Sequence, residues 1–586
     1  MTDFAAALAP LDARFAQLVA DRGVPGVAWG VVRDGRLVHD GGAGRVSLAD
    51  PATPTADHAF RIASMTKSFT AATVLLLRDE GRLRLDDPVA QFVPALAAWR
   101  PYAADAAPVT IRDLLTMSGG LATDDPWGDR QQGLPIDAFE RLLAEGPSFA
   151  LPPGVAFEYS NLGYGILGRV ITAAAGREYR DAVRERLLEP LGMAATGYLE
   201  EEVPAGRLMH GYARLGDELV REGRDGYGAL AAMGGLFSTV RDLATWVGGF
   251  LDAFPARSDA EGPHPLRRSS RREMQQGHRL AGVELPAHAP HEAPRLRVSA
   301  YGFGLERHTD PDVGTIVSHS GGYPGFGSYM AWHPASGLGV IALGSLRYAP
   351  MRPAAHEALR DLVLAGVSPR RAPAPIRALD EAVAGVDRLL EAWDDASADA
   401  LFALNMDLDL PRDLRRAALE AAVGAVRGPL RPDPGRPATS ATPAERTWWR
   451  HGVRGWLRLQ ARMTPEPNPR LQALTAEAVL EPSWALVEAA QVVLAAPWPA
   501  LPRGVAVAQG FDRDGCSRGV LAGRERFGAM RLGLPVAGDG ATTATWALET
   551  ERGGEALLRV VLDDAGRRIE AAGITVAGRA APAEGW

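Results

Sequence analysis

Ser64-Met65-Thr66-Lys67 contains the only lysine in this sequence of 586 residues. Every other basic residue is an arginine, in a composition rich in alanine, arginine, glycine and proline. A lysine amine can lose its proton when it is desolvated, whereas an arginine guanidinium keeps its charge. The single lysine therefore marks a position where a proton has to be removed. The alternative is an ordinary surface lysine.

The residues around Lys67 predict a helix that begins at Ser64, runs through Leu77 and stops at Gly81. Side chains three residues apart lie on the same face of a helix, so the serine and the lysine can meet. The helix N-terminus presents unpaired N–H groups to an oxyanion and favours a neutral amine. The pattern predicts a nucleophile and its base.

Tyr159-Ser160-Asn161 forms the second motif, in a loop that precedes a helix predicted from about Leu162. The asparagine is the only one before position 405. Its simplest role is to cap that helix, and the tyrosine alone would be a packed aromatic. A phenolic oxygen beside a lysine ammonium can instead pass a proton to a leaving group.

His319-Ser320-Gly321-Gly322 forms the third motif, directly after a predicted strand over 315–318. Two glycines after a strand let a substrate approach the edge closely and leave free N–H groups for an oxyanion. The alternative is an ordinary turn with a surface histidine.

The order and spacing of the three motifs resemble those of the penicillin-recognising serine hydrolases. These are the class C β-lactamases, D-alanyl-D-alanine carboxypeptidases, D-aminopeptidases and related esterases. The resemblance runs over roughly residues 10 to 350. Further matching segments are 85–89, 110–116, 153–161, 234–239 and 322–326. The Tyr-x-Asn form is similar to the class C branch.

The resemblance implies that Ser64 is the acylated nucleophile. Lys67 and Tyr159 would share the roles of general base and general acid. Asn161 would hydrogen-bond the lysine and a substrate amide.

The resemblance also implies an oxyanion hole made by the backbone N–H groups of Ser64 and Gly322. His319 and Ser320, followed by Gly321, would line the strand on which the substrate docks. Most β-lactamases and carboxypeptidases of the family carry Lys-Thr-Gly in place of His-Ser-Gly. A histidine is only partly charged near neutral pH and has a shorter reach. This departure disfavours a penicillin or a peptide C-terminal carboxylate as the substrate.

The expected fold class is α/β (α+β), with a β-lactamase-like antiparallel sheet flanked by helices and a helical subdomain over residues 1–367. Strands predicted at 27–32 and 36–39 are joined by an Asp-Gly turn. Core strands predicted at 314–318 and 338–343 would complete a sheet whose strands come from both ends of the domain.

A different composition follows this domain, because all eleven tyrosines lie between Tyr102 and Tyr348. We expect an α+β module over 376–482 and a mainly antiparallel β module over 483–586. The predicted elements are helical segments at 376–405 and 411–427, and antiparallel strands over 453–479 and 504–576. Neither module contains a pattern that indicates catalysis.

The whole-chain composition is typical of a globular protein, with 46% hydrophobic and 23% charged residues. A net charge of -8 without a basic stripe disfavours nucleic-acid binding. The single cysteine excludes an internal disulfide, and no motif predicts a metal or cofactor. No apolar run predicts a membrane span, and the first residues lack the features of a secretory signal, so we expect a cytoplasmic protein. Its oligomeric state is left open.

These patterns predict a serine hydrolase that cleaves an amide, peptide or ester bond of a small molecule or short peptide through an acyl-enzyme. D-Aminopeptidase-like or amidase-like activity and carboxylesterase-like activity are equally compatible with the motifs. A β-lactamase or D-alanyl-D-alanine carboxypeptidase is the alternative. A non-catalytic scaffold that retains the fold is a second alternative, and it predicts that no activity depends on Ser64.

Overall fold

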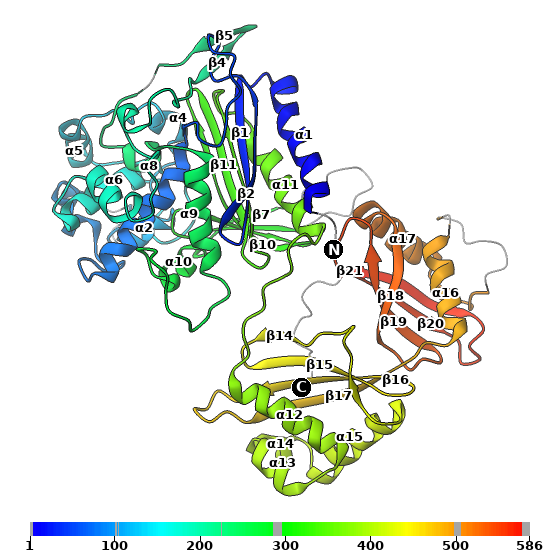
Figure 1. Ribbon diagram of the computed structural model, residues 1–586. Helices are drawn as coiled ribbons and strands as arrows, with labels where there is room; N and C mark the ends of the chain where they lie inside the picture. Colours follow the sequence, from blue (N-terminus) through cyan, green and yellow to red (C-terminus); the bar gives the residue numbers. More distant parts are fainter. Residues whose placement is uncertain are drawn as a thin grey trace. The chain divides into compact units, whose positions relative to one another are not determined.

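The computed structural model describes residues 4–99, 102–103, 105–223, 225–284, 296–496, 498 and 506–576. The chain folds into two compact units, Met1–Arg371 and Ala372–Trp586 (Figure 1). All eight residues singled out in the three motifs belong to the first unit.

The first unit is built on an eight-stranded antiparallel sheet with the order β2-β1-β12-β11-β10-β9-β8-β7. Its strands are β1 (Gly26–Arg33), β2 (Arg36–Gly44), β7 (Arg279–Glu284), β8 (Arg297–Tyr301), β9 (Glu306–Asp310), β10 (Gly314–Tyr323), β11 (Phe326–His333) and β12 (Leu338–Gly344). The first strand pairs with the last, from Val27 opposite Gly344 to Arg33 opposite Leu338. The sheet thus joins the two ends of the unit, as the sequence predicts.

Both faces of this sheet are covered. Val27 and Val31 of β1 pack with α1 (Phe4–Arg22) and α11 (Met351–Leu364), whereas Val32 belongs to the core on the opposite face. Figure 1 shows α1 and α11 on one side of the sheet and the helical body on the other. Because β1 is covered on both faces, its sequence is a continuous apolar run and not an alternating one.

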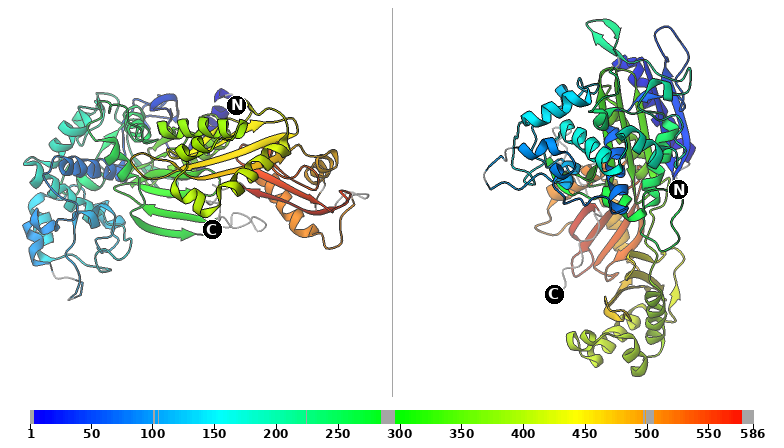
Figure 2. Two further views of the ribbon diagram at one scale, coloured as in Figure 1. Left: turned by 90° about the horizontal axis from the view of Figure 1, so that it is seen from below. Right: turned by 90° about the vertical axis from the view of Figure 1, so that its left-hand side faces the viewer.

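The helical body surrounds α2 (Thr66–Asp79), and Figure 2 shows it from two further directions. Every residue of α2 from Thr66 to Leu77 is buried, so this helix is the centre of the body. The other helices named here are α3 (Ile111–Leu115), α4 (Asp125–Gly128), α5 (Ile136–Glu145), α6 (Asn161–Ala175), α7 (Tyr179–Val183), α8 (Ala231–Gly234), α9 (Val240–Asp252) and α10 (Arg268–Met274). Two short strand pairs complete the unit, namely β3 (Phe60–Arg61) with β6 (Phe237–Ser238) and β4 (Tyr212–Leu215) with β5 (Glu218–Arg221).

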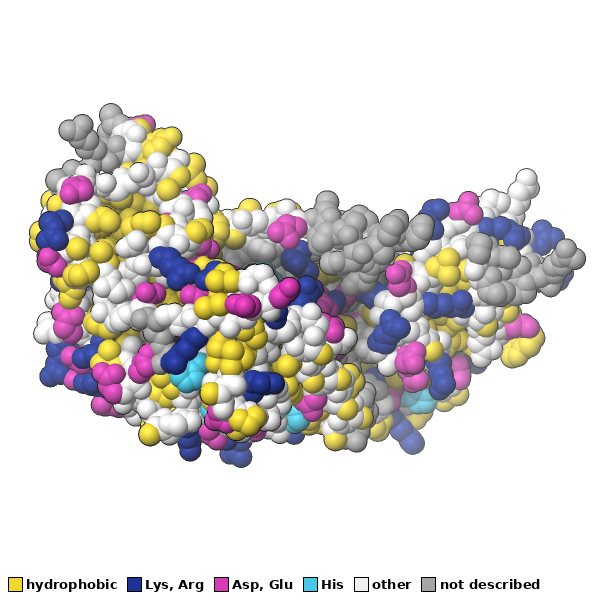
Figure 3. Space-filling view, turned by 90° about the horizontal axis from the view of Figure 1, so that it is seen from above, with side chains coloured by type: hydrophobic (Ala, Val, Ile, Leu, Met, Phe, Trp, Pro, Cys, Tyr) yellow, Lys and Arg dark blue, Asp and Glu magenta, His cyan; other side chains and the backbone are white. Residues whose placement is uncertain are grey.

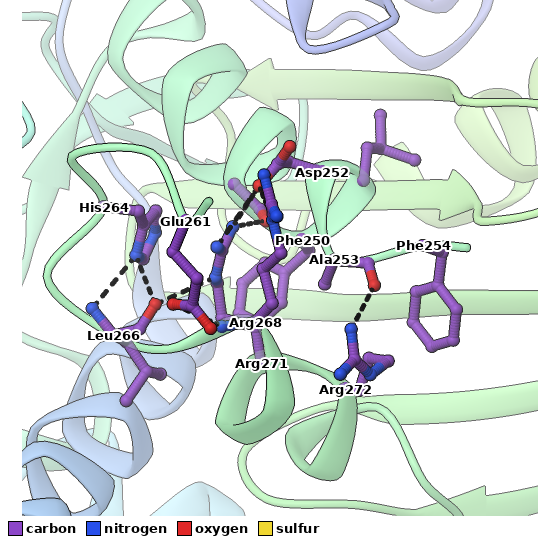
Figure 4. Close-up of polar contacts among 12 residues, drawn as sticks. Phe250, Asp252, Ala253, Phe254, Glu261, His264, Leu266, Arg268, Arg271 and Arg272 are labelled. Carbon is purple, nitrogen blue, oxygen red and sulfur yellow. Dashed lines mark hydrogen bonds and ion pairs between the residues drawn. The ribbon is translucent and has the colours of Figure 1, made fainter. Parts of the chain in front are cut away.

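An ion cluster joins the end of α9 to α10 (Figure 4). The Asp252 carboxylate accepts hydrogen bonds from Arg268 at 3.1 Å and from Arg271 at 3.3 Å. Arg271 is 1% exposed, so a carboxylate partner is needed to offset the burial of its charge. The cluster therefore stabilises the packing of the two helices.

The second unit contains two antiparallel sheets, each with its own hydrophobic core and helices. The first sheet has the helices α12 (Arg377–Glu391), α13 (Asp395–Leu401), α14 (Leu404–Asp409) and α15 (Arg412–Val426) and the strands β13 (Arg431–Pro432), β14 (Thr439–Thr442), β15 (Glu445–His451), β16 (Gly455–Met463) and β17 (Leu471–Leu480). The second has α16 (Trp484–Ala495), α17 (Arg513–Phe527), β18 (Met530–Ala537), β19 (Thr543–Thr550), β20 (Ala556–Leu562) and β21 (Ile569–Val576).

The expectation of strands throughout 504–576 is wrong for α17. Asp512 caps this helix by accepting a hydrogen bond from Gly515 N at 2.7 Å, and Gly528 ends it with a φ of 73°. The buried residues Cys516, Val520 and Phe527 recur at helical and not at strand spacing. A search for alternating apolar residues does not detect this helix, because apart from Leu521 the residues between these three are small or charged.

The surface mixes charges of both signs. On the face shown in Figure 3, basic and acidic side chains are interspersed, unlike the continuous basic surface of nucleic-acid-binding proteins. Within the described part of the chain, every helix is too short or too polar to cross a bilayer.

Candidate active site

Lys67 lies at the centre of a buried polar group that unites two of the three motifs. Its Nζ is 2.9 Å from Ser64 Oγ, 2.7 Å from Asn161 Oδ1 and 2.8 Å from Met233 O. The two carbonyl oxygens can only accept hydrogen bonds, whereas the serine hydroxyl can also donate. A neutral amine has two hydrogens for the carbonyls and one lone pair for the hydroxyl. The geometry therefore allows a neutral lysine to accept the serine proton, and it allows the ammonium that results to donate to all three oxygens.

The burial of Lys67 makes this neutral form accessible. Complete burial lowers the pKa of Lys67 to about 8, although the nearby Asp125, Asp129 and Asp124 act in the opposite direction. An amine with this pKa is partly deprotonated at physiological pH. A surface role for the lysine is excluded by its burial.

Ser64 lies in a 3₁₀ turn, Ala63–Met65, that leads into α2. The α-helix itself begins at Thr66, two residues after the start that the sequence predicts. Ala63 has a φ of 50°, which an L residue adopts at a cost of about 1–2 kcal/mol. The N–H groups of such a first turn lack partners within the helix. Ser64 is 8% exposed and Lys67 0%, so the hydroxyl lies toward the solvent side of its base.

The edge of β10 approaches the segment that precedes Ser64. Ser328 Oγ of the neighbouring strand donates a hydrogen bond to Ile62 O at 2.7 Å. A Cβ at Gly321 would overlap both of these oxygen atoms and would lie 3.0 Å from Ala63 Cβ. Glycine in the third motif is therefore required for close packing of the strand against the nucleophile segment.

The backbone of Gly322 faces outward from the sheet at this edge. β9 pairs with β10 only over Gly314–Ser318, which leaves residues 319–323 unpaired on that side. On the other side, the two-residue turn after Tyr323 places it opposite Phe326 in a hydrogen-bonded pair. Because pairs alternate along an antiparallel ladder, the Gly322 N–H points away from β11 toward the free edge.

Asn161 is not the helix cap that its position suggests. Ser160 is the N-cap of α6, and its Oγ accepts from Gly163 N at 3.1 Å. Asn161 is the first helical residue and is wholly buried. While Oδ1 accepts from Lys67, its Nδ2 donates to Asp125 Oδ1 at 2.8 Å. The side chain thus links the lysine to a carboxylate.

Tyr159 lies over the lysine, with Lys67 Nζ 4.9 Å from the centre of its ring. Burial raises the pKa of Tyr159 well above its ordinary value, and a hydrogen bond with Ser64 acts in the opposite direction. The phenol therefore stays protonated at physiological pH and can donate a proton.

His319 is buried at 1% exposure, so it is not the surface histidine of the simplest interpretation. Its Nδ1 is 2.6 Å from Ser320 O, and its Nε2 is 3.0 Å from Tyr301 Oη. Because a carbonyl only accepts, Nδ1 carries the proton and Nε2 accepts from the tyrosine. Burial lowers the pKa of His319 to about 4. The residue is a neutral imidazole with both nitrogens occupied.

Three carboxylates that the sequence analysis did not select lie beside this group. Asp124 accepts from the backbone N–H groups of Asn161 at 2.6 Å and Leu162 at 2.8 Å, at the start of α6. Asp125 is exposed, whereas Asp129 is 5% exposed. The sequence does contain one sign of these residues, because three aspartates fall within six positions. Their spacing, however, does not connect them to the three motifs. Within the described residues, no group of three or more potential ligands is arranged to hold a metal ion.

Residues 11–365 match the family model described as Beta-lactamase. Penicillin-binding protein 4 of Amycolatopsis lactamdurans is 35% identical over a segment covering 32% of this chain and 49% of that protein. The chain thus spans about half the length of this relative. The D-alanyl-D-alanine-carboxypeptidase/endopeptidase AmpH of Escherichia coli (strain K12) is 26% identical, over 50% of this chain and 71% of that protein.

Among solved structures, the octameric penicillin-binding protein homologue from Pyrococcus abyssi matches with a TM-score of 0.52. The match covers 95% of this chain and 96% of that one at 20% identity, so it concerns the fold. The family model, by contrast, covers more than half of the 586 residues. The chain therefore belongs to the Beta-lactamase family of serine hydrolases.

Proposed function

We propose that this chain is an active hydrolase that cleaves an amide, peptide or ester bond through an acyl-enzyme on Ser64. The observation that carries the proposal is the arrangement around Lys67 Nζ, where two oxygens only accept and the third belongs to the serine hydroxyl. A buried amine in this arrangement is a base for a nucleophile.

In the proposed reaction, Ser64 Oγ attacks the carbonyl carbon of the substrate and its proton passes to Lys67 Nζ. The N–H groups of Ser64 and Gly322 stabilise the negative charge on the carbonyl oxygen. Tyr159 donates its proton to the leaving nitrogen or oxygen and regains one from the lysine. A water molecule then cleaves the acyl-enzyme, which restores the serine hydroxyl and releases the acid.

The proposal favours aminopeptidase-like, amidase-like or carboxylesterase-like activity over β-lactamase or carboxypeptidase activity. Substrates of the latter two classes carry a carboxylate, which a cation would bind. His319 stands where many relatives have lysine, and it is neutral with both ring nitrogens occupied. Within the third motif, no charged group replaces it.

The test asks whether the full-length protein reacts with a covalent probe and turns over substrates in a way that depends on Ser64. A fluorophosphonate probe is expected to add to the peptide that contains Ser64, as detected by mass spectrometry, and not to the Ser64→Ala variant. Initial rates are then measured on a D-alanyl anilide, a short-chain nitrophenyl ester and a cephalosporin. Serine-dependent turnover of the first or second, but not the third, is expected. A folded protein with neither labelling nor turnover would favour the scaffold alternative.

The proposed base also predicts the pH dependence of acylation. Because the pKa of Lys67 is about 8 and the neutral amine is the reactive form, kcat/KM on a neutral ester is expected to rise with pH and level off above about 8. The negative charge of Asp125 raises the pKa of Lys67. The Asp125→Asn variant lacks this charge, so the midpoint of its pH–rate profile should move to lower pH. Asp137→Asn, an exposed site paired with Arg141, is the control. A midpoint that is unchanged in Asp125→Asn would contradict the assignment.

A further inference from the structure

Met117 follows helix α3 in a backbone conformation that normally belongs to glycine. Its φ is 55°, its N–H donates to Leu114 O at 3.3 Å, and the next N–H, of Ser118, donates to Asp113 O at 2.8 Å. This pair of hydrogen bonds is the Schellman arrangement of a helix end, in which the left-handed residue is usually glycine because a Cβ is unfavourable there. A methionine at this position is therefore unfavourable for the helix end, and its own contacts must offset the strain.

The contacts of Met117 lie on both sides of Tyr159. Met117 O accepts a hydrogen bond from Glu158 N at 2.7 Å, and Met117 Sδ accepts one from Ser160 N at 3.4 Å. Within the described part of the chain, this sulfur is the only acceptor of the Ser160 N–H, and Ser160 is 4% exposed. A buried N–H without an acceptor is costly, so even the weak acceptor that a thioether provides is favourable here.

Tyr159 depends on these contacts because no regular element fixes its backbone. Residues 157–160 belong to no helix or strand, and α6 begins only at Asn161. The tyrosine must nevertheless hold its hydroxyl at Ser64, since it is the proposed donor of the proton to the leaving group. A displacement of about 1 Å is enough to slow a reaction greatly. Because Met117 binds both neighbours of Tyr159, it limits such a displacement.

Filling of the core does not by itself account for Met117. Met193 is equally buried in the same core, at 1% exposure against 2% for Met117. In the turn before Met193, however, a glycine takes the left-handed conformation, because Gly192 has a φ of 67°. The sulfur of Met193 accepts no hydrogen bond from any residue that the structure describes. Met193 is therefore a matched control for a methionine that only packs.

We propose that Met117 is a positioning residue that holds Tyr159 for proton donation to the leaving group, through its carbonyl on one side and its sulfur on the other. The inference rests on the Ser64 acyl-enzyme and the Tyr159 acid of the proposed function, and it adds to them a residue outside the three motifs. A nitrophenolate leaves without a proton, whereas an alkoxide must be protonated. Loss of the sulfur contact should therefore slow mainly those reactions that need the Tyr159 proton.

The experiment uses two esters with one acyl group, p-nitrophenyl butyrate and ethyl butyrate. Both form the same acyl-enzyme, so kcat/KM reports the acylation step in which they differ. Met117→Leu keeps the approximate size of the side chain but removes the sulfur. It is expected to lower kcat/KM about tenfold on ethyl butyrate and at most about threefold on the nitrophenyl ester. Met117→Gln supplies a carbonyl acceptor for the Ser160 N–H and should recover most of this loss, and Met193→Leu should leave both rates unchanged.

Tyr159→Phe connects the effect to the proton donor. This variant should show the same selectivity between the esters with a larger loss, and adding Met117→Leu to it should lower neither rate further. An equal loss on both esters in Met117→Leu, no recovery in Met117→Gln, or a further loss in the double variant overturns the positioning role. Thermal unfolding shows that each variant is folded. Met117→Gly, which suits the left-handed backbone, replaces Met117→Leu if the latter does not fold.

The D-alanyl anilide takes the place of ethyl butyrate if the protein turns over no ester, because its leaving nitrogen must be protonated. The rate of fluorophosphonate labelling then takes the place of the nitrophenyl ester, because fluoride leaves without a proton. Absence of both labelling and turnover at Ser64 defeats the acyl-enzyme, and a Tyr159→Phe variant without selectivity defeats the Tyr159 acid; the role of Met117 falls with either. With both intact, the Met117 variants alone decide the positioning role.

Discussion

Replacing Lys67 with arginine is expected to lower kcat/KM by roughly a thousandfold or more, because it removes the base of the nucleophile. The guanidinium keeps the positive charge but has no lone pair for the Ser64 proton. Its planar fork also cannot place one nitrogen among the oxygens of Ser64, Asn161 and Met233 that surround Nζ. The measurement is the pre-steady-state acylation rate on a nitrophenyl ester.

Arg141→Lys, at an exposed ion pair with Asp137, is the control for exchange of the two basic side chains and should be neutral. Because arginine could disturb a wholly buried site, Lys67→Ala is measured beside it. Partial rescue of Lys67→Ala by added methylamine would show that the missing element is an amine. Near-wild-type activity of a folded Lys67→Arg protein is incompatible with a general-base role.

Replacing Gly321 with alanine is expected to lower kcat/KM about a hundredfold, because the edge of β10 must move away from Ser64. The added Cβ would overlap Ile62 O, which is a backbone atom and cannot swing aside, as well as Ser328 Oγ. Overpacking of this kind also lowers the free energy of unfolding by about 1–3 kcal/mol. Ester kinetics and thermal unfolding measure the two effects.

Gly282→Ala is the matched control, because Gly282 lies in β7 of the same sheet and its new Cβ would have no atom within 4 Å. It should leave both activity and stability nearly unchanged. If Gly321→Ala behaved like this control, the close approach of β10 to the nucleophile segment would not be needed for acylation.

The local parts of the site could be predicted from the sequence. The three-residue spacing of Ser64 and Lys67 brings their side chains together in any helical turn, and the structure places them 2.9 Å apart. The apolar strands at both ends of the first unit likewise predicted one sheet with strands from both ends, in which the structure pairs β1 with β12. In the second unit, most residues between Cys516 and Phe527 are small or charged, and they concealed the helical period of α17.

The sequence by itself predicted the candidate chemistry and the family. A lone lysine three residues after a serine, with Tyr159 and His319 in the same order as in related hydrolases, can be recognised without long-range geometry. Only the tertiary structure decided the charge state of the site. Burial removes the charge of His319, and folding brings Asp125 to Asn161 and Asp129 to Tyr348, 219 residues apart in the chain. Desolvation and electrostatic interactions depend on distances in space, which residue types and their spacing do not contain.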